Sequence, residues 1–356
     1  MSEVRMLARL WRGRAQLWFS VTPARAGAYL AGKVLGFALT AFALSAPGAQ
    51  PASAPRQISY PARPIRLIAP FPAGGVADAV ARLLAERLSA RLGVPVDVDN
   101  RPGSAGTLAG DLVAKSSSDG HTLLFHQANM LIQPGLEPVP YDVQRDFTPV
   151  ARVATMPLFL AVGAHLPVRT VQQWMTAVRT NPAAYSYGSG QPGTPAHLYA
   201  EYTVLGLRNG VPLVTAKGEG AVVQEMLAGR ISACFCSYGA VQAHVRNGAL
   251  RLLGVTGLKR SPLAPAVPTL QEAGLDGYSA AAWFGVLAPA KTPHAIVARL
   301  AAELAAVMAE REVHERLQAA GLTPMSDVPD AFATAIRTDQ LQWQAILREA
   351  GGQGSP

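Results

Sequence analysis

The sequence predicts an α/β protein built from two similar lobes. Short apolar runs alternate along the chain with longer amphipathic runs, a pattern typical of strands that alternate with helices. The 356 residues allow about two domains. With 49% hydrophobic and 15% charged residues, the composition favours a core-forming protein and excludes a mainly disordered one.

The expected strands are short apolar runs, most of them bounded by Gly, Pro, Asn or Asp. All of them are four to six residues long. We expect ten strands, at Ile65–Ala69, Val94–Val98, Thr122–Phe125, Pro149–Ala154, Leu158–Val162, Tyr185–Gly188, Leu213–Ala216, Ile231–Cys236, Leu252–Thr256 and Trp283–Ala288.

The expected helices lie between these strands and show apolar residues at helical spacing. In Asp78–Leu92 the leucines and Val80 fall on one stripe, with most charges off it. Such stripes are interpreted as core packing. Further helices are expected at Leu108–Lys115, Val171–Arg179, Ala196–Leu207, Ala221–Ala228, Val241–Asn247, His294–Ala309, Val313–Ala320 and Phe332–Arg348.

The amino-terminal segment predicts export. An uncharged run, Val34–Ala46, follows Lys33 and leads into small residues that end at Ala54, which is the pattern of a secretory signal peptide. The run would reach only about 20 Å as a helix, against roughly 30 Å of bilayer hydrocarbon. We expect residues 1–54 to be a leader cleaved after Ala54 and the protein to be periplasmic; an uncleaved anchor is the alternative.

The net charge of +8 is concentrated in this leader. Residues 1–54 hold six basic residues and one acidic residue, which leaves a nearly balanced remainder. Basic residues are not interleaved with aromatic ones along a helix, so we expect no nucleic-acid partner.

Two cysteines, Cys234 and Cys236, lie two residues apart in a strand-like run. Residues at this spacing on a strand are about 6.5 to 7 Å apart, whereas a disulfide needs Cβ atoms about 4 Å apart. We therefore expect two packed thiols rather than a bridge. Further metal ligands are missing beside them, and the seven histidines show no helical metal spacing, so no metal site and no cofactor are expected.

A strand, a Pro/Gly turn and a helix start follow one another between Ile65 and Asp78. Glycines at 74 and 75 let a backbone approach a ligand closely. The helix start offers unpaired N–H groups and a partial positive charge, which suit a carboxylate. Asp78 could cap that helix or bond back to the loop. The alternative is an ordinary strand-to-helix turn.

A second turn of this kind follows the strand that ends at Gly188. Ser189 and Thr194 offer hydroxyls there, and Pro195 suits a first helical turn. One loop from each lobe could therefore hold one small acid between them. His197 is either a ligand contact or a histidine bonded to nearby backbone.

Together with shorter motifs, these two loops resemble the extracytoplasmic solute receptors of the tripartite tricarboxylate transporter family, the Bug or TctC-like proteins. The resemblance covers about residues 60 to 350. The other motifs are Asn100-Arg101-Pro102-Gly103, Asp119-Gly120-His121-Thr122-Leu123-Leu124, Tyr141-Asp142, Arg145-Asp146-Phe147, Lys259-Arg260-Ser261, Val267-Pro268-Thr269, Glu272-Ala273-Gly274, Trp283-Phe284-Gly285 and Ala288-Pro289.

This resemblance implies a two-lobed periplasmic binding protein of the Venus-flytrap type, type II-like, with a Rossmann-like sheet and flanking helices in each lobe. Residues 55–158 and 284–356 would form the first lobe and residues 159–283 the second. The family binds its ligand carboxylate mainly through backbone amides and waters, without catalysis. The implied ligand-binding residues are Phe71, Pro72, Ala73, Gly74, Gly75, Asp78, Gly188, Ser189, Gly190, Gly193, Thr194 and His197. Lys217 is a further candidate, either as a counter-ion of the ligand or as a solvated lysine of its loop.

Three departures from the family pattern concern the identity of the ligand. Thr215-Ala216-Lys217-Gly218 stands where the family usually has Pro-Tyr-Lys-Gly, which removes an aromatic ring. Phe235-Cys236-Ser237 stands where Phe-Asp-Asn is common, which removes one carboxylate. Residues 125–134 also depart from the usual Gly/Thr-rich wording.

Catalysis is disfavoured by the motifs. The chain has no G-x-S-x-G around Ser104 or Ser189 and no phosphate-binding or zinc-protease motif, so no catalytic residue is assigned. The resemblance implies a monomeric receptor that delivers a small organic acid to the membrane permease subunits of a tripartite transporter. A sensor that presents the acid to a signalling partner is the alternative, and a periplasmic hydrolase a more remote one.

Overall fold

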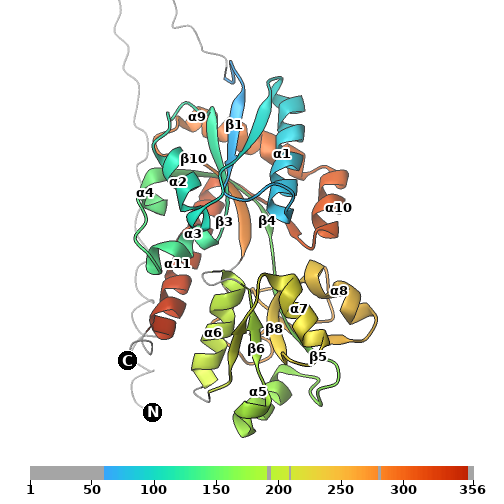
Figure 1. Cartoon of the computed structure of the whole chain (residues 1–356). Helices are drawn as coiled ribbons and strands as arrows, with labels where there is room; N and C mark the ends of the chain where they lie inside the picture. Colours follow the sequence, from blue (N-terminus) through green and yellow to red (C-terminus); the bar gives the residue numbers. More distant parts are fainter. Residues whose placement is uncertain (1–59, 191–193, 208–209, 280–281, 352–356) are drawn as a thin grey trace, which may run out of the picture. The chain divides into compact units, whose positions relative to one another are not determined.

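Two β-sheets organise the part of the chain that the computed structural model describes, which is residues 60–190, 194–207, 210–279 and 282–351. The strand order is β11-β4-β10-β3-β1-β2 in the first sheet and β7-β6-β8-β5-β9 in the second. Helices lie beside both sheets (Figure 1), which confirms the α/β class. The expected leader, residues 1–54, lies outside the described residues.

The first sheet collects strands from two separate stretches of chain. β1 is parallel to β2 and β3, whereas β10 is antiparallel to β3 and β4, and β11 is antiparallel to β4. Its strands are β1 (Ile65–Ala69), β2 (Val96–Asn100), β3 (Thr122–Gln127), β4 (Phe147–Thr155), β10 (Trp283–Pro289) and β11 (Thr323–Asp327), and its long helices are α1 (Val76–Leu92), α2 (Thr107–Ala114), α9 (His294–Met308) and α10 (Arg311–Ala319).

The second sheet is formed by one continuous stretch, which the chain enters after Thr155 and leaves before Trp283. β5 is antiparallel to β8 and β9, and β6 is parallel to β7 and β8. Its elements are β5 (Leu158–Gly163), α5 (Val171–Thr180), β6 (Tyr187–Ser189), α6 (Pro195–Leu207), β7 (Leu213–Thr215), α7 (Glu219–Leu227), β8 (Ala233–Ser237), α8 (Tyr238–Arg246) and β9 (Leu250–Val255).

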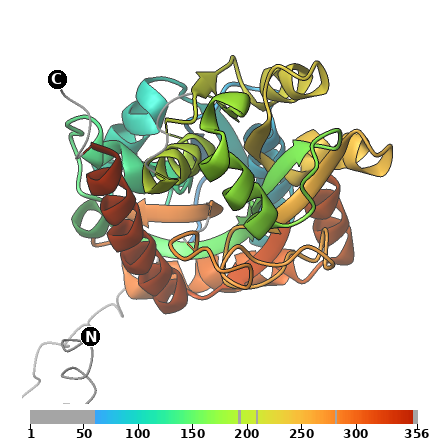
Figure 2. The ribbon, with the colours of Figure 1, turned by 90° about the horizontal axis from the view of Figure 1, so that it is seen from below.

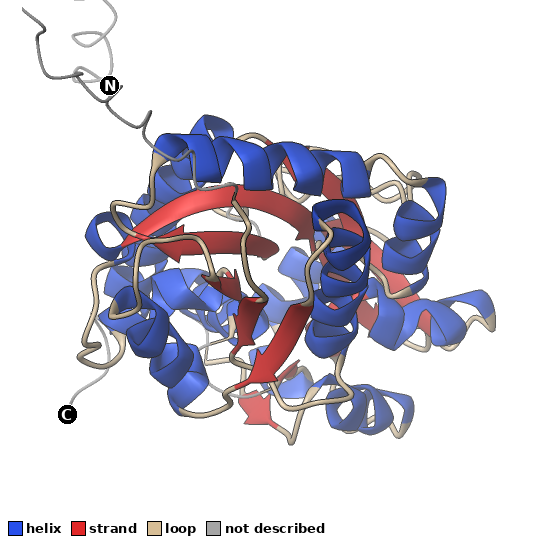
Figure 3. Ribbon diagram, turned by 90° about the horizontal axis from the view of Figure 1, so that it is seen from above, coloured by secondary structure: helices blue, strands red, loops and turns tan. Residues whose placement is uncertain are grey.

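The long helix α11 (Pro329–Gly351) contacts elements of both sheets. The ring of Trp343 lies 5.0 Å from the ring of Tyr199 on α6. Gln342 accepts a hydrogen bond from the Ser279 hydroxyl at 3.0 Å and donates one to the Gly277 carbonyl at 3.1 Å. Figure 2 shows α11 in dark red, and Figure 3 shows the strands in red among their blue helices.

Amphipathic spacing located the long helices well. In α1 the expected stripe is buried, Leu84 and Leu88 almost completely. The helix ends at Gly93, whose positive φ of 71° lets its N–H bond the Ser89 carbonyl. The short helices α3 (Asn129–Ile132) and α4 (Val143–Asp146), and the strand β11, were not expected. β11 reads TPMSD and is only partly buried, so neither an apolar run nor alternation marks it.

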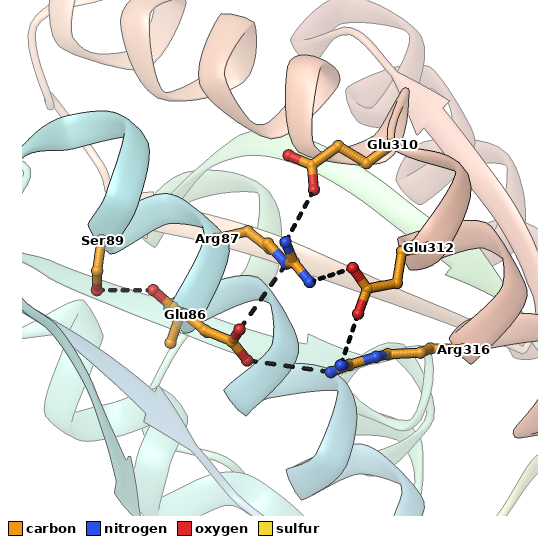
Figure 4. A network of polar contacts seen from close by, with 7 residues as sticks. Glu86, Arg87, Ser89, Glu310, Glu312 and Arg316 are labelled. Carbon is orange, nitrogen blue, oxygen red and sulfur yellow. Dashed lines mark hydrogen bonds and ion pairs between the residues drawn. The ribbon is translucent and has the colours of Figure 1, made fainter.

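An ion-pair network joins α1 to α10 and to Glu310, the N-cap residue of α10 (Figure 4). Arg87 pairs with Glu312 at 2.7 Å and with Glu310 at 3.5 Å, and Arg316 pairs with Glu312 at 2.6 Å. The Arg87 side chain is 25% exposed, so solvent screens part of this attraction. The network ties down the face of α1 that lies away from its packed stripe.

The expectation of two unbridged thiols was wrong. Cys234 and Cys236 form a disulfide within β8, with their Cα atoms 5.8 Å apart. This separation is shorter than the ideal two-residue repeat of a strand and lies within the range that a disulfide allows. Both residues are buried in a small core with Val222 and Ile231.

Candidate ligand-binding site

The first predicted loop connects β1 to the start of α1. Residues 72–75 are exposed, and Gly74 has a positive φ of 88°, a conformation that favours glycine. Gly75 is the N-cap of α1 and makes no side-chain cap hydrogen bond. The first N–H groups of α1 therefore lack a capping side chain, beside an accessible backbone.

Asp78 bonds back to this loop. Its Oδ2 accepts the Gly74 N–H at 2.9 Å, and its Oδ1 accepts the side-chain amide of Asn100 at 2.8 Å. Asn100 also donates to the Phe71 carbonyl at 3.0 Å. Asp78 is only 3% exposed, so its carboxylate bonds to the loop from the protein interior.

Arg82 completes this arrangement. It donates to Asp78 Oδ2 at 2.9 Å and to Asn100 Oδ1 at 2.9 Å. The hydrogen bond from Arg82, followed by those from Gly74 and Asn100, lowers the pKa of Asp78 to about 2 against the opposing effect of burial. The carboxylate is therefore ionised throughout the neutral range.

Sequence reasoning missed Asn100 and Arg82 as functional positions. Asn100 ends β2, which runs parallel to β1, and carboxyl ends of parallel strands meet at one sheet edge. Arg82 lies four residues after Asp78, one helical turn away. The spacing of Arg82 was visible in the sequence, whereas the place of Asn100 beside the loop follows from the pairing of β1 with β2.

A buried histidine supports the wall of the first loop. The His126 ring lies 6.2 Å from the Phe71 ring, and the space beside Gly106 is filled by His126, whose Nε2 would lie 2.6 Å from an added Cβ. Burial lowers the pKa of His126 to about 4. His126 is therefore neutral near pH 7 and acts as a packed ring.

The second predicted loop connects β6 to α6. Ser189 and His197 are both buried, and the Ser189 hydroxyl lies 2.7 Å from His197 Nδ1. Thr194 Oγ1 accepts the His197 N–H at 3.3 Å, and the Thr194 carbonyl accepts the Leu198 N–H at 3.0 Å. The structure thus brings together three of the predicted residues.

Glu201 extends this cluster and was not predicted. Its Oε1 lies 3.0 Å from Nε2 of His197, one helical turn earlier on α6. The four-residue spacing is the signal that could have identified the pair. A serine, an imidazole and a carboxylate therefore lie in line at the carboxyl end of β6.

The two glycines of β6 and its loop have different surroundings. A Cβ on Gly188 would lie 2.6 Å from Val222 Cγ1 and 2.8 Å from Ile231 Cγ2, so this glycine allows close packing. A Cβ on Gly190 would lie 3.7 Å from Gly218 Cα and 3.9 Å from the Glu219 nitrogen. Gly190 therefore borders the start of α7.

Lys217 is exposed and immediately precedes this start. Glu219 follows, and its carboxylate accepts the Ser237 hydroxyl at 2.6 Å and the Ser237 N–H at 3.2 Å. Burial raises the pKa of Glu219, while the bonds from Ser237 oppose that shift. A carboxylate thus lies at the end of β8 although Cys236 replaces the usual aspartate.

The predicted residues form two clusters, one after β1 and one after β6. Gly193 lies outside the described residues. A cavity of 510 Å³ elsewhere, between α9 and the β11–α11 connection, is lined by alanines of α9 and by Asp327 and Asp330. Asp327 is paired with Arg152, and the lining residues include no Arg or Lys that could pair with an anionic ligand.

The described ranges, 60–190, 194–207, 210–279 and 282–351, show neither a metal site nor a membrane span. Within them, His, Cys, Asp and Glu side chains form no group of three or more that could hold a metal ion. No helix there is both long enough and apolar enough to cross a membrane.

Comparison with known proteins identifies the family. The model of the tripartite tricarboxylate transporter family receptor matches residues 80–351. A UPF0065 protein from the tcbD-tcbE intergenic region of Pseudomonas sp. (strain P51) is 38% identical over 300 residues, which cover 83% of this chain and 89% of that protein. BugT of Bordetella pertussis is 34% identical over 298 residues, covering 83% and 91%.

A solved structure is similar to this chain in both fold and sequence. Rpa4515 of R. palustris, solved with adipate, superposes with a TM-score of 0.69 at 32% identity, over 82% of this chain and 98% of that one. The two-lobed α/β fold of periplasmic binding proteins is thereby confirmed. The chain belongs to the receptor family of the tripartite tricarboxylate transporters, a family of solute-binding receptors.

Proposed function

We propose that this protein captures a small carboxylate-bearing organic acid in the periplasm and delivers it to the membrane subunits of a tripartite transporter. Family membership supports a receptor role. The adipate held by Rpa4515 supports a carboxylate as ligand. Basic and acidic residues are nearly balanced after residue 54. An anionic ligand would therefore be recognised by hydrogen-bond donors at the site rather than by a broad basic surface.

The observation that carries this proposal is the first loop. Its residues 72–75 are exposed, α1 begins there without a side-chain cap, and Asp78 and Asn100 hold the backbone from behind. Fixed backbone N–H groups at the start of a 17-residue helix form an anion site whose donors need no reordering when a carboxylate binds.

The second loop would close on the same acid. Ser189, Gly190, Thr194 and His197 precede or begin α6, and Lys217 precedes α7. A ligand that contacts one loop from each lobe binds a closed form better than an open one, so it shifts the population toward closure. The lobes in this proposal are residues 55–158 with 284–356 and residues 159–283, in a monomer.

The test is a thermal-shift panel of mono-, di- and tricarboxylates, adipate included, on protein refolded free of carried-over ligand. An acid at 100 times its dissociation constant should add about 2.7 kcal/mol of stability. Isothermal titration should then give one site per chain. A protein that responds to no carboxylate in the panel would contradict the proposal.

Export has its own measurement. The mature amino terminus of the protein recovered from the periplasm should begin directly after Ala54. A terminus before residue 34 would contradict cleavage at that position, because the apolar run would then remain attached.

A further inference from the structure

The two polar contacts of His197, with Ser189 and with Glu201, determine which atom carries each hydrogen. An ionised carboxylate only accepts hydrogen bonds, so His197 Nε2, 3.0 Å from Glu201 Oε1, must carry a proton. In a neutral imidazole the other nitrogen is then an acceptor. With a neutral imidazole, the Ser189 hydroxyl donates its hydrogen to His197 Nδ1 at 2.7 Å, which is closer than its other acceptor, the Gly190 carbonyl at 3.3 Å.

In this state Ser189 has no hydrogen left for a ligand carboxylate. Its oxygen presents only lone pairs, which repel the lone pairs of an anion. Protonation of His197 at Nδ1 reverses the bond, because Nδ1–H then donates to the Ser189 oxygen. The Ser189 hydrogen is then released from His197, and an anion that binds at this loop competes for it with the Gly190 carbonyl, 3.3 Å away.

We propose that binding of a carboxylate at the second loop is coupled to the uptake of one proton by His197, with Glu201 as the positioning residue. This inference rests on the proposed function. The proton comes from solvent and goes to Nδ1; the ligand carboxylate gains the Ser189 hydrogen bond, and the imidazolium is held between Glu201 and Ser189. An anion that requires the released hydrogen favours the charged imidazole, so binding and protonation support each other.

Within the part of the chain that the structure describes, the carboxylate in contact with His197 is that of Glu201. Strands β6, β7 and β8, which pack against α6, contribute Tyr187 and the two cysteines of the disulfide. Burial raises the pKa of Tyr187, so its phenol stays neutral near pH 7, and the bonded cysteines do not titrate. Helix α11 also packs against α6 and brings Asp330, Arg337, Asp339 and Arg348.

Other titratable groups near the two loops can be separated from His197. Burial, with a smaller effect of the Asp339 charge, raises the pKa of Tyr199, so this phenol stays neutral near pH 7. Asp78 and His126 have pKa values of about 2 and about 4, so neither changes state near pH 7. Lys217 and Glu219 border Gly190, and burial raises the pKa of Glu219, which makes Glu219 the competing proton acceptor.

The experiment is isothermal titration of the whole mature protein with adipate, between about pH 6 and pH 8. If adipate does not bind, the acid that gives the largest shift in the panel takes its place. Titration in buffers with different heats of ionisation counts the protons taken up. We expect an uptake that approaches one proton, and a Kd that rises with pH by up to tenfold per pH unit.

Four variants test whether His197 is the group that takes up the proton when the ligand binds. Ser189→Ala should bind more weakly and lose the uptake, because no hydroxyl hydrogen remains to be released. Glu201→Gln should lose most of the uptake near pH 7 and regain part of it at lower pH, whereas a merely structural effect would weaken binding equally at every pH. Glu219→Gln should keep the uptake. Asp119→Asn is the matched control, since Asp119 lies 3.4 Å from His121, far from these loops in the sequence, and should behave as wild type.

The outcomes separate the two proposals. Binding of an acid with no proton uptake and a Kd independent of pH overturns the coupling and leaves the receptor function intact. Uptake that persists in Ser189→Ala, or disappears in Glu219→Gln, also overturns it. If no carboxylate binds, the proposed function and the coupling fail together.

Discussion

The carboxylate of Asp78 accepts the N–H of Gly74 at 2.9 Å, and this bond ties the first turn of α1 to the loop before it. The same carboxylate accepts Asn100, which in turn donates to the Phe71 carbonyl. One buried anion therefore fixes both ends of an exposed, glycine-containing backbone. The rigidity of the loop comes from residues behind it rather than from residues within it.

Replacing Asp78 with Asn should loosen this loop and leave Arg82 without its carboxylate. We expect a loss of stability of about 1 to 3 kcal/mol and weaker binding of the carboxylate ligand, measured by urea denaturation and titration calorimetry. Asp97→Asn, an exposed position on β2, is the matched control and should change stability by less than about 0.5 kcal/mol. Equal behaviour of the two variants would contradict the anchoring role.

The pKa of Asp78, lowered from 3.8 to about 2, also predicts a pH dependence. A carboxyl group with a depressed folded-state pKa contributes stability that is present above about pH 4 and is lost as the pH falls toward 2. The contribution is on the order of 2 kcal/mol. Below pH 4, the urea midpoint of the wild-type protein should therefore fall more steeply with falling pH than the midpoint of Asp78→Asn. Equal slopes for the two proteins below pH 4 would contradict this role of Asp78.

The elements predicted correctly from the sequence are those in which apolar residues recur at a regular spacing. The apolar stripe of α1 and the runs of β1, β3 and β10 lie within a few residues of their expected bounds, because burial on one face imposes regular spacing. The strand β11 was missed, because its TPMSD segment is only partly buried and is held to β4 by ladder pairing and by the Asp327–Arg152 ion pair. Tertiary pairing of this kind leaves no periodic pattern in the sequence.

The candidate site could be predicted in its loops but not in its supports. Turn glycines and helix starts are local signals, so residues 71–78 and 188–197 could be identified from the sequence. Asn100 and Glu219 support these loops across strand ends and helix starts, and such contacts depend on the fold. The Cys234–Cys236 bridge was not expected, because ideal strand geometry separates residues two apart by about 6.5 to 7 Å, whereas these two Cα atoms are 5.8 Å apart.

The structure assigns Gly188 to packing, and this can be tested apart from binding. An added methyl group would lie within 2.8 Å of Val222 and Ile231, which are both buried in the core beneath β6. We expect Gly188→Ala to cost about 1 to 3 kcal/mol of unfolding free energy, measured in urea. A stable variant that has lost only its ligand affinity would instead make Gly188 a ligand contact.

Removal of the disulfide should have a modest effect on stability. Cys234 and Cys236 close a loop of only three residues, so the cross-link constrains the unfolded chain little. The double variant Cys234→Ala, Cys236→Ala should lose about 1.5 kcal/mol by this entropy, apart from packing. Thermal denaturation of the oxidised protein and the variant measures the difference; a variant that cannot fold would show that the bridge holds β8 together.

Bulk added to the exposed backbone of the first loop should block the ligand without unfolding the protein. Gly75 has a negative φ of −85°, and the nearest atom to an added Cβ is the Pro72 carbonyl oxygen at 4.0 Å. Gly75→Val is therefore free of backbone strain, but its branched side chain would occupy the space that a carboxylate needs next to the N–H groups of α1.

Gly190→Val should act in the same way on the second loop. Its Cβ would be in ordinary contact with Gly218 and Glu219, so the side chain fills the border between the loop and α7. Both variants should keep the wild-type melting temperature without ligand and lose at least about tenfold in affinity, or 1.4 kcal/mol. Ala302→Val, exposed on α9, is the control. Wild-type affinity in both loop variants would show that the acid binds through neither backbone.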